Sequence, residues 1–186
     1  LSNLRRPDTR QFVWERYGLA AGSSVLPFFC SPDVGQSIDA VDSLAKLLAE
    51  IDLYCPEVIV RPHPRCPEQL RLESACRPCP FIHFDGGGTI SNQDLLRASL
   101  FTLSMGSTVT LESLVLGVPS AFFQVDWDFK DLNHLYRNLV DVVRIRTENQ
   151  LQKFVSVVMR NEGPPLIGNV ENHRGALART WRIVEV

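Results

Sequence analysis

The stretch that most constrains the fold runs from residue 98 to residue 125 and reads ASLFTLSMGSTVTLESLVLGVPSAFFQV. The apolar run Leu100–Leu103, with aromatic and β-branched members, is typical of a strand covered on both faces. A glycine turn follows, then a helix that ends at Gly117, and Pro119 leads into a second strand. Four apolar residues are expected on one face of that helix: Leu111, Leu114, Val115 and Val118.

The turn between this strand and this helix, residues 104–108, carries the functional signal. Gly106 permits a sharp reversal, and Ser107 or Thr108 can cap the helix, so several backbone N–H groups are expected to point outward. Unpaired N–H groups at the start of a helix favour negatively charged ligands. The turn is therefore predicted to be an anion-binding site.

Glu112 is the only charged side chain in this stretch, on a helix apolar enough to be buried on most sides. It lies one turn after Thr108, and helical side chains lean toward the N-terminus, so its carboxylate is expected to point back at the turn. A carboxylate there could accept hydrogen bonds from ribose hydroxyls. The alternative is a Glu that pairs with an internal Arg or reaches the solvent at the rim.

The order Ser-x-Gly-Ser-Thr, then Glu four residues after the Thr, then Gly-x-Pro before a strand, resembles a known arrangement. It is similar to the nucleotide-sugar-binding C-terminal domain of GT-B glycosyltransferases and of the related sugar-nucleotide 2-epimerases. The resemblance implies that Gly106, Ser107 and Thr108 contact the donor phosphates. It also implies that Glu112 holds the ribose.

A second group of candidate residues, Arg61-Pro-His-Pro64, stands at the end of another predicted strand, residues 57–61. The prolines restrict the backbone on both sides of His63, where a protonated ring or a neutral Nε2–H could meet a phosphate. Arg61 and Arg65 add positive charge that suits phosphate oxygens. The alternative is a rigid loop in which His63 is an ordinary surface residue.

Arg-x-His-Pro followed downstream by a Ser-rich turn resembles transferases that use CMP- or CDP-activated donors. These are bacterial sialyltransferases, Kdo transferases of capsule and lipopolysaccharide assembly, and CDP-glycerol polymerases of teichoic acid synthesis. The resemblance implies that the nucleotide phosphate is contacted by His63, Ser104, Ser107 and Thr108. Together the two resemblances span about residues 7–150.

The whole chain alternates predicted strands with predicted helices. Strands are expected at residues 24–30, 57–61, 81–84, 100–103, after Pro119 and at 142–145; helices at 7–18, 36–52, 68–75, 91–99, after the turn at 104–108, and at 131–139, after 147 and at 170–181. This order makes parallel βαβ units with right-handed crossovers. We therefore predict an α/β fold, a doubly wound, Rossmann-like parallel sheet of about six strands with helices on both faces. The resemblance makes it one half of a GT-B fold.

The length of 186 residues suits one main domain, and 45% hydrophobic residues suffice for a core. No Met occurs before Met105, so we expect a piece of a longer chain. The expected parts are a linker at residues 1–22 from a missing N-terminal domain, a nucleotide-sugar-binding domain at 23–164, and a C-terminal helix within 165–186.

Charge and hydropathy exclude several partners. With 19 basic and 21 acidic residues the net charge is −2, which gives no general attraction to nucleic acid or anionic lipid. No apolar run approaches the ~20 residues that a membrane helix needs, and there is no signal-peptide pattern. We expect no transmembrane segment and a cytoplasmic location, at most peripheral to the inner face of the membrane.

Metal and disulfide sites are not expected. Cys76-Arg-Pro-Cys79 has metal-type spacing, with Cys66 and His63 or His83 as further candidates, but no second CxxC pair exists. Five cysteines are an odd number, which favours reduced thiols. Asp126-Trp-Asp128 fits an Asp-x-Asp metal pattern but is interpreted as a solvated loop.

Two other sequences have weaker meanings. Asp85-Gly-Gly-Gly-Thr89 lacks dinucleotide spacing, so a plain loop is favoured, although its glycines could let the backbone approach a nucleobase. Met105-Gly-Ser107 is not the G-x-S-x-G elbow of serine hydrolases.

The combined interpretation is the donor-nucleotide-binding domain of a glycosyltransferase acting in surface polysaccharide synthesis, of the capsule, lipopolysaccharide or teichoic-acid type. His63 and Arg61 are the expected catalytic residues, meeting the charge on the leaving phosphate, with no metal or other cofactor. A CMP- or CDP-linked sugar is expected rather than a UDP-linked one, and the glycan acceptor would bind the missing N-terminal domain. The chain alone is therefore expected to bind nucleotide without turnover. Two alternatives stay open: an enzyme like UDP-N-acetylglucosamine 2-epimerase, and a non-catalytic interaction domain.

Overall fold

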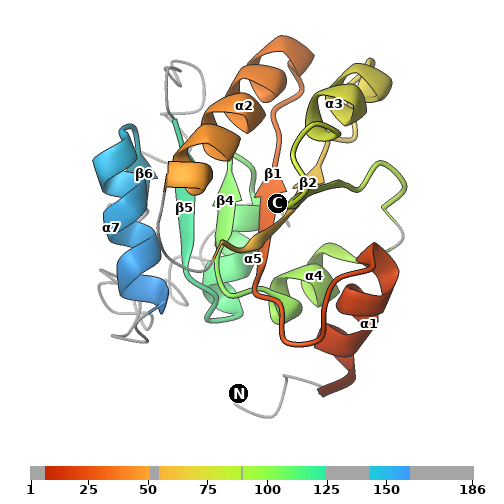
Figure 1. Ribbon diagram of the computed structural model, residues 1–186, viewed down its shortest axis with the longest axis vertical. Coiled ribbons are helices and arrows are strands. Elements are labelled where there is room, and N and C mark those ends of the chain that lie inside the picture. The colour runs from red at the N-terminus through yellow and green to blue at the C-terminus, as the bar shows by residue number, and fades with distance from the viewer. Residues whose placement is uncertain (1–6, 51–54, 89, 125–142, 160–186) are drawn as a thin grey trace, which may run out of the picture.

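The computed structural model describes residues 7–50, 55–88, 90–124 and 143–159 (Figure 1). These residues form a six-stranded parallel sheet with helices on both faces. The strands are β1 (Val25–Phe29), β2 (Glu57–Arg61), β3 (Ile82–Phe84), β4 (Thr102–Ser104), β5 (Ser120–Phe123) and β6 (Val143–Ile145). Their order is β3-β2-β1-β4-β5-β6, and neighbouring strands are parallel. The predicted α/β fold with a doubly wound sheet is confirmed.

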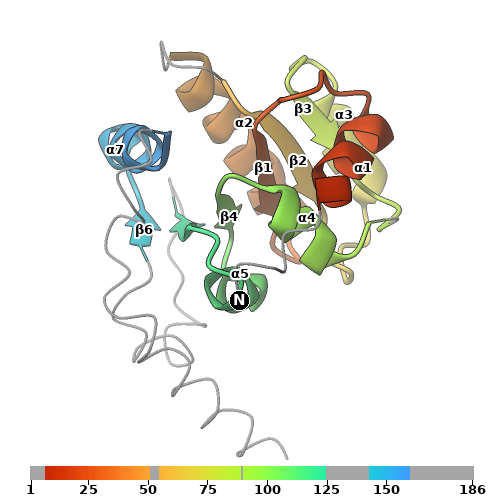
Figure 2. The ribbon, with the colours of Figure 1, turned by 90° about the horizontal axis from the view of Figure 1, so that it is seen from below.

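Two layers of helices cover the sheet. The described helices are α1 (Pro7–Tyr17), α2 (Val34–Glu50), α3 (Gln69–Cys76), α4 (Asn92–Ala98), α5 (Val109–Val115) and α7 (Glu148–Met159). One core cluster contains residues of α2, α3 and α7, and the other contains residues of α1, α4 and α5. Figure 2 shows α4 and α5 on the side of the strands opposite to α2 and α7.

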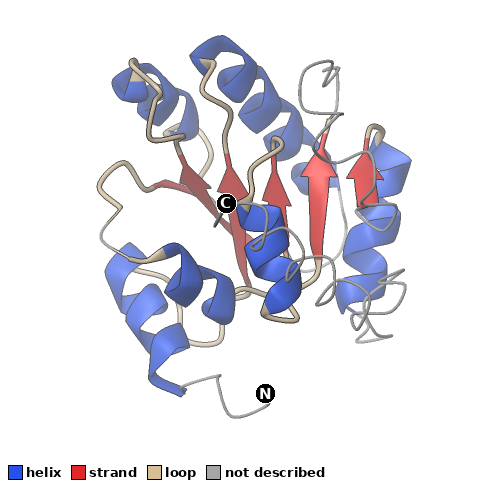
Figure 3. Ribbon diagram, turned by 180° about the vertical axis from the view of Figure 1, so that it is seen from behind, coloured by secondary structure: helices blue, strands red, loops and turns tan. Residues whose placement is uncertain are grey.

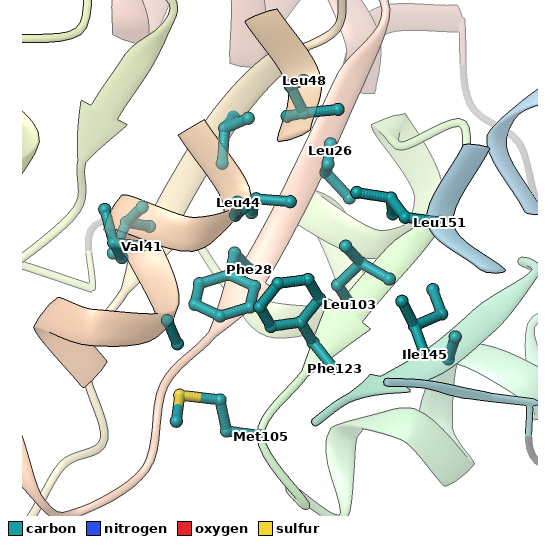
Figure 4. Packing of buried hydrophobic residues seen from close by; sticks show 14 of the residues in the cluster. Leu26, Phe28, Val41, Leu44, Leu48, Leu103, Met105, Phe123, Ile145 and Leu151 are labelled. Atoms are coloured by element: carbon teal, nitrogen blue, oxygen red, sulfur yellow. The ribbon is translucent and has the colours of Figure 1, made fainter. Parts of the chain in front are cut away.

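The two clusters follow from the alternation of side chains along β1. Leu26 and Phe28 belong to the cluster with α2, whereas Val25 and Phe29 belong to the cluster with α1, as the period of two in a strand requires. The rings of Phe28 and Phe123 meet edge to face with centroids 5.6 Å apart (Figure 4). Each fully buried side chain of this size contributes about 1.5–3 kcal/mol of hydrophobic stabilisation.

The long helix α2 agrees with its sequence pattern. Val41, Leu44 and Leu48 are buried, as expected for one apolar face. The four charged residues of this helix are exposed, as the opposite face of an amphipathic helix requires: Asp39, Asp42, Lys46 and Glu50. The predicted start of α4 is also confirmed, because the Ser91 hydroxyl accepts a hydrogen bond from the Asp94 N–H over 3.1 Å.

The helix α5 differs from its sequence pattern. Val115 was expected on the buried stripe but is 47% exposed, whereas Thr110 and Ser113 are fully buried. Glu112 is also exposed, so Glu112 and Val115 mark the solvent-facing side of this helix. Hydroxyl groups can take this buried face because β4 supplies matching hydroxyl partners, as the site geometry shows. The glycine stop is confirmed, since Gly117 has φ +71°.

The chain reverses its direction of travel across the sheet after β3. It runs outward from β1 through β2 to β3, returns to the other side of β1 with β4, and continues to β5 and β6. The strand order therefore reverses at the carboxyl ends of β1 and β4, and such a topological switch point is the usual ligand site of doubly wound sheets. The strand arrows in Figure 3 point the same way, so the described segments that follow β1, β2, β3 and β4 lie at this edge.

Several predictions fall outside the described residues. These are the helices at 131–139 and 170–181, the pattern Asp126-Trp-Asp128, and the predicted C-terminal part at 165–186. The boundaries at residues 1–22, 23–164 and 165–186 stay predictions.

In α1, Val13 is fully buried in the second cluster and the Trp14 indole donates to the Ser23 carbonyl over 2.9 Å.

Candidate functional site

Three loops meet at the switch point. The segment after β1 begins at Cys30, the segment after β2 contains His63, and the turn after β4 spans residues 105–108. Backbone hydrogen bonds align these strand ends: the Cys30 N–H donates to the Arg61 carbonyl over 3.0 Å, and the Met105 N–H donates to the Phe29 carbonyl over 2.9 Å. With adjacent strands about 4.8 Å apart, β2 and β4 are separated by about 10 Å, with β1 between them.

Ser104 lies beneath the turn and is fully buried. Its hydroxyl is 2.7 Å from the Thr110 hydroxyl and accepts a hydrogen bond from the Ser107 N–H over 3.3 Å. Gly106 has φ +89°, a conformation that side chains disfavour, which explains the glycine at this position. The hydroxyl of Ser104 therefore organises the turn from below rather than facing the crevice.

The outer part of the turn has fewer unpaired backbone donors than the sequence suggested. The Val109 N–H donates to the Ser107 hydroxyl over 3.2 Å, and the Thr110 N–H donates to the Ser107 carbonyl over 3.1 Å. Thr108 is exposed, and no partner is recorded for its N–H among the described residues. The donors left for an anion are the Thr108 N–H and the hydroxyls of Ser107 and Thr108.

A second hydroxyl pair supports the same helix. The Ser113 hydroxyl lies 3.2 Å from the Thr102 hydroxyl and 3.2 Å from the Val118 carbonyl, and hydrogen-bonds with both. Thr102 and Ser113 are fully buried. With Ser104 and Thr110 they form a buried polar seam between β4 and α5. Alternating Thr and Ser on the strand, with Thr and Ser three apart on the helix, was the sequence signal for it.

Glu112 lies on the first turns of α5, four residues after Thr108, and its side chain is exposed. No ion pair of Glu112 occurs among the described residues. The alternative of a carboxylate paired with an internal Arg therefore finds no support in this part of the chain. An exposed carboxylate beside the turn is free to accept hydrogen bonds from a ligand.

The ring of His63 is held by its own loop. The Arg65 N–H donates to His63 Nδ1 over 3.1 Å, and the Cys66 N–H donates to the His63 carbonyl over 2.8 Å. A neutral ring that accepts at Nδ1 carries its proton on Nε2. Loss of hydration, and then the charge of Arg65, lower the pKa of His63 below its usual value. The loop therefore favours a neutral imidazole whose Nε2–H is available as a donor.

Arg61, the other predicted catalytic residue, has a different environment from the one expected. Its side chain is buried, and all three guanidinium nitrogens donate to protein oxygens. Nε and Nη2 donate to Asp85 Oδ2, Nη1 to Asn92 Oδ1 over 2.6 Å, and Nη2 also to the Ile90 carbonyl over 2.8 Å. Arg65, by contrast, is exposed.

The loop after β3 begins at Asp85, the ion-pair partner of Arg61. Asp85 is buried and its N–H donates to the Val60 carbonyl over 2.9 Å, whereas Gly86, Gly87 and Gly88 are exposed. A Cβ on Gly86 would lie 2.5 Å from the Phe84 ring, so a side chain at this position would require the ring to move. The loop lies at the same edge as His63.

The loop after β1 borders the switch point but was not among the predicted site residues. Asp33 caps α2, accepting a hydrogen bond from the Gln36 N–H over 2.9 Å, and the Ser31 hydroxyl accepts one from the Asp33 N–H over 3.0 Å. The order Ser-Pro-Asp before an amphipathic helix was the signal available in the sequence.

No metal site is found in the described part of the chain. None of its groups of His, Cys, Asp and Glu is arranged to hold a metal ion. The five cysteines are free thiols. Burial raises the pKa of Cys76 to about 12 and that of Cys55 to about 11, which keeps both thiols protonated at neutral pH.

Comparisons with known proteins give the fold a context. No family model and no curated protein matches the chain. Among solved structures, the UDP-GlcNAc 2-epimerase of Methanocaldococcus jannaschii, in complex with UDP-GlcNAc and UDP, matches with a TM-score of 0.59 and 16% identity. That match covers 97% of this chain and 49% of the epimerase.

The wall teichoic acid polymerase TagF matches with a TM-score of 0.59 and 14% identity, over 96% of this chain and 48% of the polymerase. A TagF variant soaked with CDPG matches with the same TM-score and 15% identity, over 96% and 46% of the two chains. At these identities the likeness shows a shared Rossmann-like fold. The chain spans about half the length of the solved proteins it matches.

No helix in the described part of the chain is both long and apolar enough to cross a membrane.

Proposed function

We propose that this chain is the donor-nucleotide-binding domain of a glycosyltransferase that acts in surface polysaccharide synthesis. The observation that carries the proposal is the arrangement at the switch point: the His63 loop and the hydroxyl-rich turn at Ser107 and Thr108 end strands on either side of β1. A ligand in the crevice would have hydrogen-bond donors on both sides, which suits the phosphates of a nucleotide.

The turn after β4 holds the phosphate from one side. Its donors are the hydroxyls of Ser107 and Thr108 and the Thr108 N–H, with Gly106 allowing close approach of the backbone. Ser104 supports the turn through its bonds to Thr110 and Ser107. These donors meet the charge that grows on the leaving phosphate when the sugar is displaced.

His63 holds the phosphate from the other side as a neutral Nε2–H donor. Its Nδ1 already accepts the Arg65 N–H, so a proton added at Nδ1 would break that bond. The exposed Arg65 supplies positive charge nearby. A neutral Nε2–H stabilises the phosphate by hydrogen bonding, and the positive charge in this proposal comes from Arg65.

Glu112 binds the ribose in this proposal. Its carboxylate is exposed one helical turn beyond Thr108, and an ionised carboxylate accepts hydrogen bonds from two neighbouring hydroxyls. One solved neighbour holds UDP-GlcNAc and UDP and another was soaked with CDPG, which supports an activated-sugar type of ligand for this fold. We assign a CMP- or CDP-linked donor, on the resemblance carried by Arg61-Pro-His-Pro64.

We assign the binding of the glycan acceptor, and the transfer step itself, to a further domain outside these 186 residues. The solved neighbours are about twice as long as the matched part, which supports a further domain in the working enzyme. The 186-residue chain alone is then expected to bind nucleotide without transferring sugar.

Calorimetric titration of CMP, CDP, UDP and GDP into the 186-residue chain tests the proposal. We expect a cytidine nucleotide to bind most tightly, and replacing a group that hydrogen-bonds the ligand should weaken binding about 10-fold or more. His63→Asn is the sharpest variant, because the Asn carbonyl can still accept the Arg65 N–H while the Nε2–H is lost. His83→Asn, on β3 and paired with Glu57, is the matched control.

A second candidate is an enzyme like the UDP-GlcNAc 2-epimerases, favoured by the fold match. It predicts tightest binding of UDP and formation of the epimer from UDP-N-acetylglucosamine by the full-length protein. Absence of binding by all four nucleotides would instead favour the non-catalytic domain and overturn the proposed function.

A further inference from the structure

Arg61 joins three segments that are distant in the sequence. It is the last residue of β2, while Asp85 directly follows β3 and Asn92 begins α4. Its own carbonyl accepts the Cys30 N–H, so its backbone also ties β2 to the end of β1. One residue thus connects the carboxyl ends of three adjacent strands with the helix that follows the third.

Separating the charges of Arg61 and Asp85 would be energetically unfavourable. The side chains of Arg61 and Asp85 are 10% and 3% exposed, and removing one partner of a buried ion pair is strongly destabilising because the other charge stays buried and unpaired. Four of the five N–H donors of Arg61 are engaged by Asp85, Asn92 and the Ile90 carbonyl, so a two-pronged contact with a phosphate would require release of at least one of these partners. The buried geometry therefore disfavours Arg61 as a phosphate ligand.

The position of His63 is coupled to that of Arg61 by a short backbone segment with restricted conformation. Only Pro62 lies between them, and Pro64 follows, so the backbone of this segment has few conformations. The backbone direction at the end of β2 consequently determines the position of the His63 imidazole. The same guanidinium holds Asp85 and the Ile90 carbonyl, on either side of the exposed glycines 86–88.

We propose that Arg61 is a positioning residue of the nucleotide site: it holds the His63 segment and the glycine loop after β3 at a fixed spacing, and it does not itself contact phosphate. This inference rests on the proposed function. The buried face of α1 closes the network, since the Tyr17 hydroxyl is buried near Asp85, where loss of hydration and the carboxylate charge raise the pKa of Tyr17.

The test is a double-mutant cycle read by calorimetry with CDP and UDP as probes. The variants are Arg61→Lys, Asp85→Asn and the double variant, with Asn92→Ala as a milder change that removes a single acceptor. Arg71→Lys, on the surface of α3 with only an exposed pair to Glu68, is the matched control. Circular dichroism of each variant verifies the fold.

A positioning role predicts that Asp85→Asn and Arg61→Lys each weaken binding about 10-fold or more, and that the double variant is little worse than either. Asn92→Ala should weaken binding by a smaller factor in the same direction. A phosphate ligand predicts the reverse for Asp85→Asn, because the released guanidinium would bind the probe more tightly. Unchanged or tighter binding in Asp85→Asn overturns the inference.

A readout without nucleotide separates this inference from the proposed function. The NMR signals of the His63 ring and of the amides of Gly86–Gly88 should shift in Asp85→Asn and Asn92→Ala but not in Arg71→Lys. If neither probe binds the unmodified chain, the proposed function fails, and these shifts alone decide the positioning role. Unmoved His63 and glycine signals in a folded Asp85→Asn variant would overturn it.

Discussion

The hydroxyl groups of Ser104 and Thr110 lie 2.7 Å apart in the fully buried seam between β4 and α5. This pair connects the last residue of a strand to the first turn of the next helix, and the turn between them carries the proposed phosphate contacts. The seam therefore supports the turn from its buried side, and we expect changes in the seam to alter the shape of the proposed site.

Replacing Ser104 with Ala should lower both stability and nucleotide affinity. The change leaves the Thr110 hydroxyl and the Ser107 N–H without their partner, which costs about 1–3 kcal/mol. Urea unfolding measures the loss of stability. Ser74→Ala, an exposed serine on α3, is the control and should change the free energy of unfolding very little. An unchanged Ser104→Ala variant would show that the seam contributes no stability.

The lowered pKa of His63 gives a testable pH dependence of stability. A histidine whose pKa is lower in the folded state than in the unfolded state favours folding when neutral, so its contribution is lost as pH falls through the range below its usual value of about 6.5. The Tm of the unmodified chain should fall more between pH 7 and pH 5 than that of His63→Asn. Parallel Tm curves for the two proteins would contradict this prediction.

The carboxylates of Glu50 and Glu148 oppose each other between α2 and α7. A hydrogen bond to Glu50, and then its charge, raise the pKa of Glu148, which means that the folded state binds this proton more tightly than the unfolded chain does. Stability associated with the pair is therefore lost as pH rises above the usual value of about 4.3 for Glu. We expect Glu50→Gln to raise the Tm at pH 7.

The gain in Glu50→Gln should disappear as pH falls toward 4, where the pair shares a proton in the unmodified chain. Glu50 also ends α2, where a negative charge is unfavourable to the helix dipole, so both effects have the same sign at pH 7. Glu73→Gln is the control, because Glu73 pairs with Arg77 and its replacement should not raise the Tm. A gain that persists at pH 4 would exclude repulsion between the two carboxylates.

Gly117 after α5 should tolerate Asn better than Ala. Its φ of +71° is left-handed, and nothing lies within 4 Å of an added Cβ, so the cost is purely conformational. Ala in this conformation should cost about 1 kcal/mol and Asn less, since Asn visits it more readily. Thermal unfolding of the two variants measures the difference, and equal losses would argue against a backbone origin.

Much of the architecture was predictable because its signals are local. The apolar period of α2, the serine cap of α4 and the glycine after α5 each involve residues within a few positions of one another. The alternation of such segments then predicted the parallel sheet. The buried face of α5 was predicted only in part: Leu114 and Val118 are buried as expected, whereas the burial of Thr110 and Ser113 depends on hydroxyl partners on β4.

The candidate site likewise has some features that follow from local sequence and others that depend on contacts between distant residues. The sequence by itself determined that a glycine turn, a proline-flanked His63 and Glu112 follow or adjoin strand ends, because strand and turn chemistry are set by neighbouring residues. Only the tertiary structure decided that the guanidinium of Arg61 is held by side chains 24 and 31 residues away. Whether a charged group is free for a ligand depends on which distant atoms the folded chain brings within hydrogen-bonding distance, and residue type alone does not specify that.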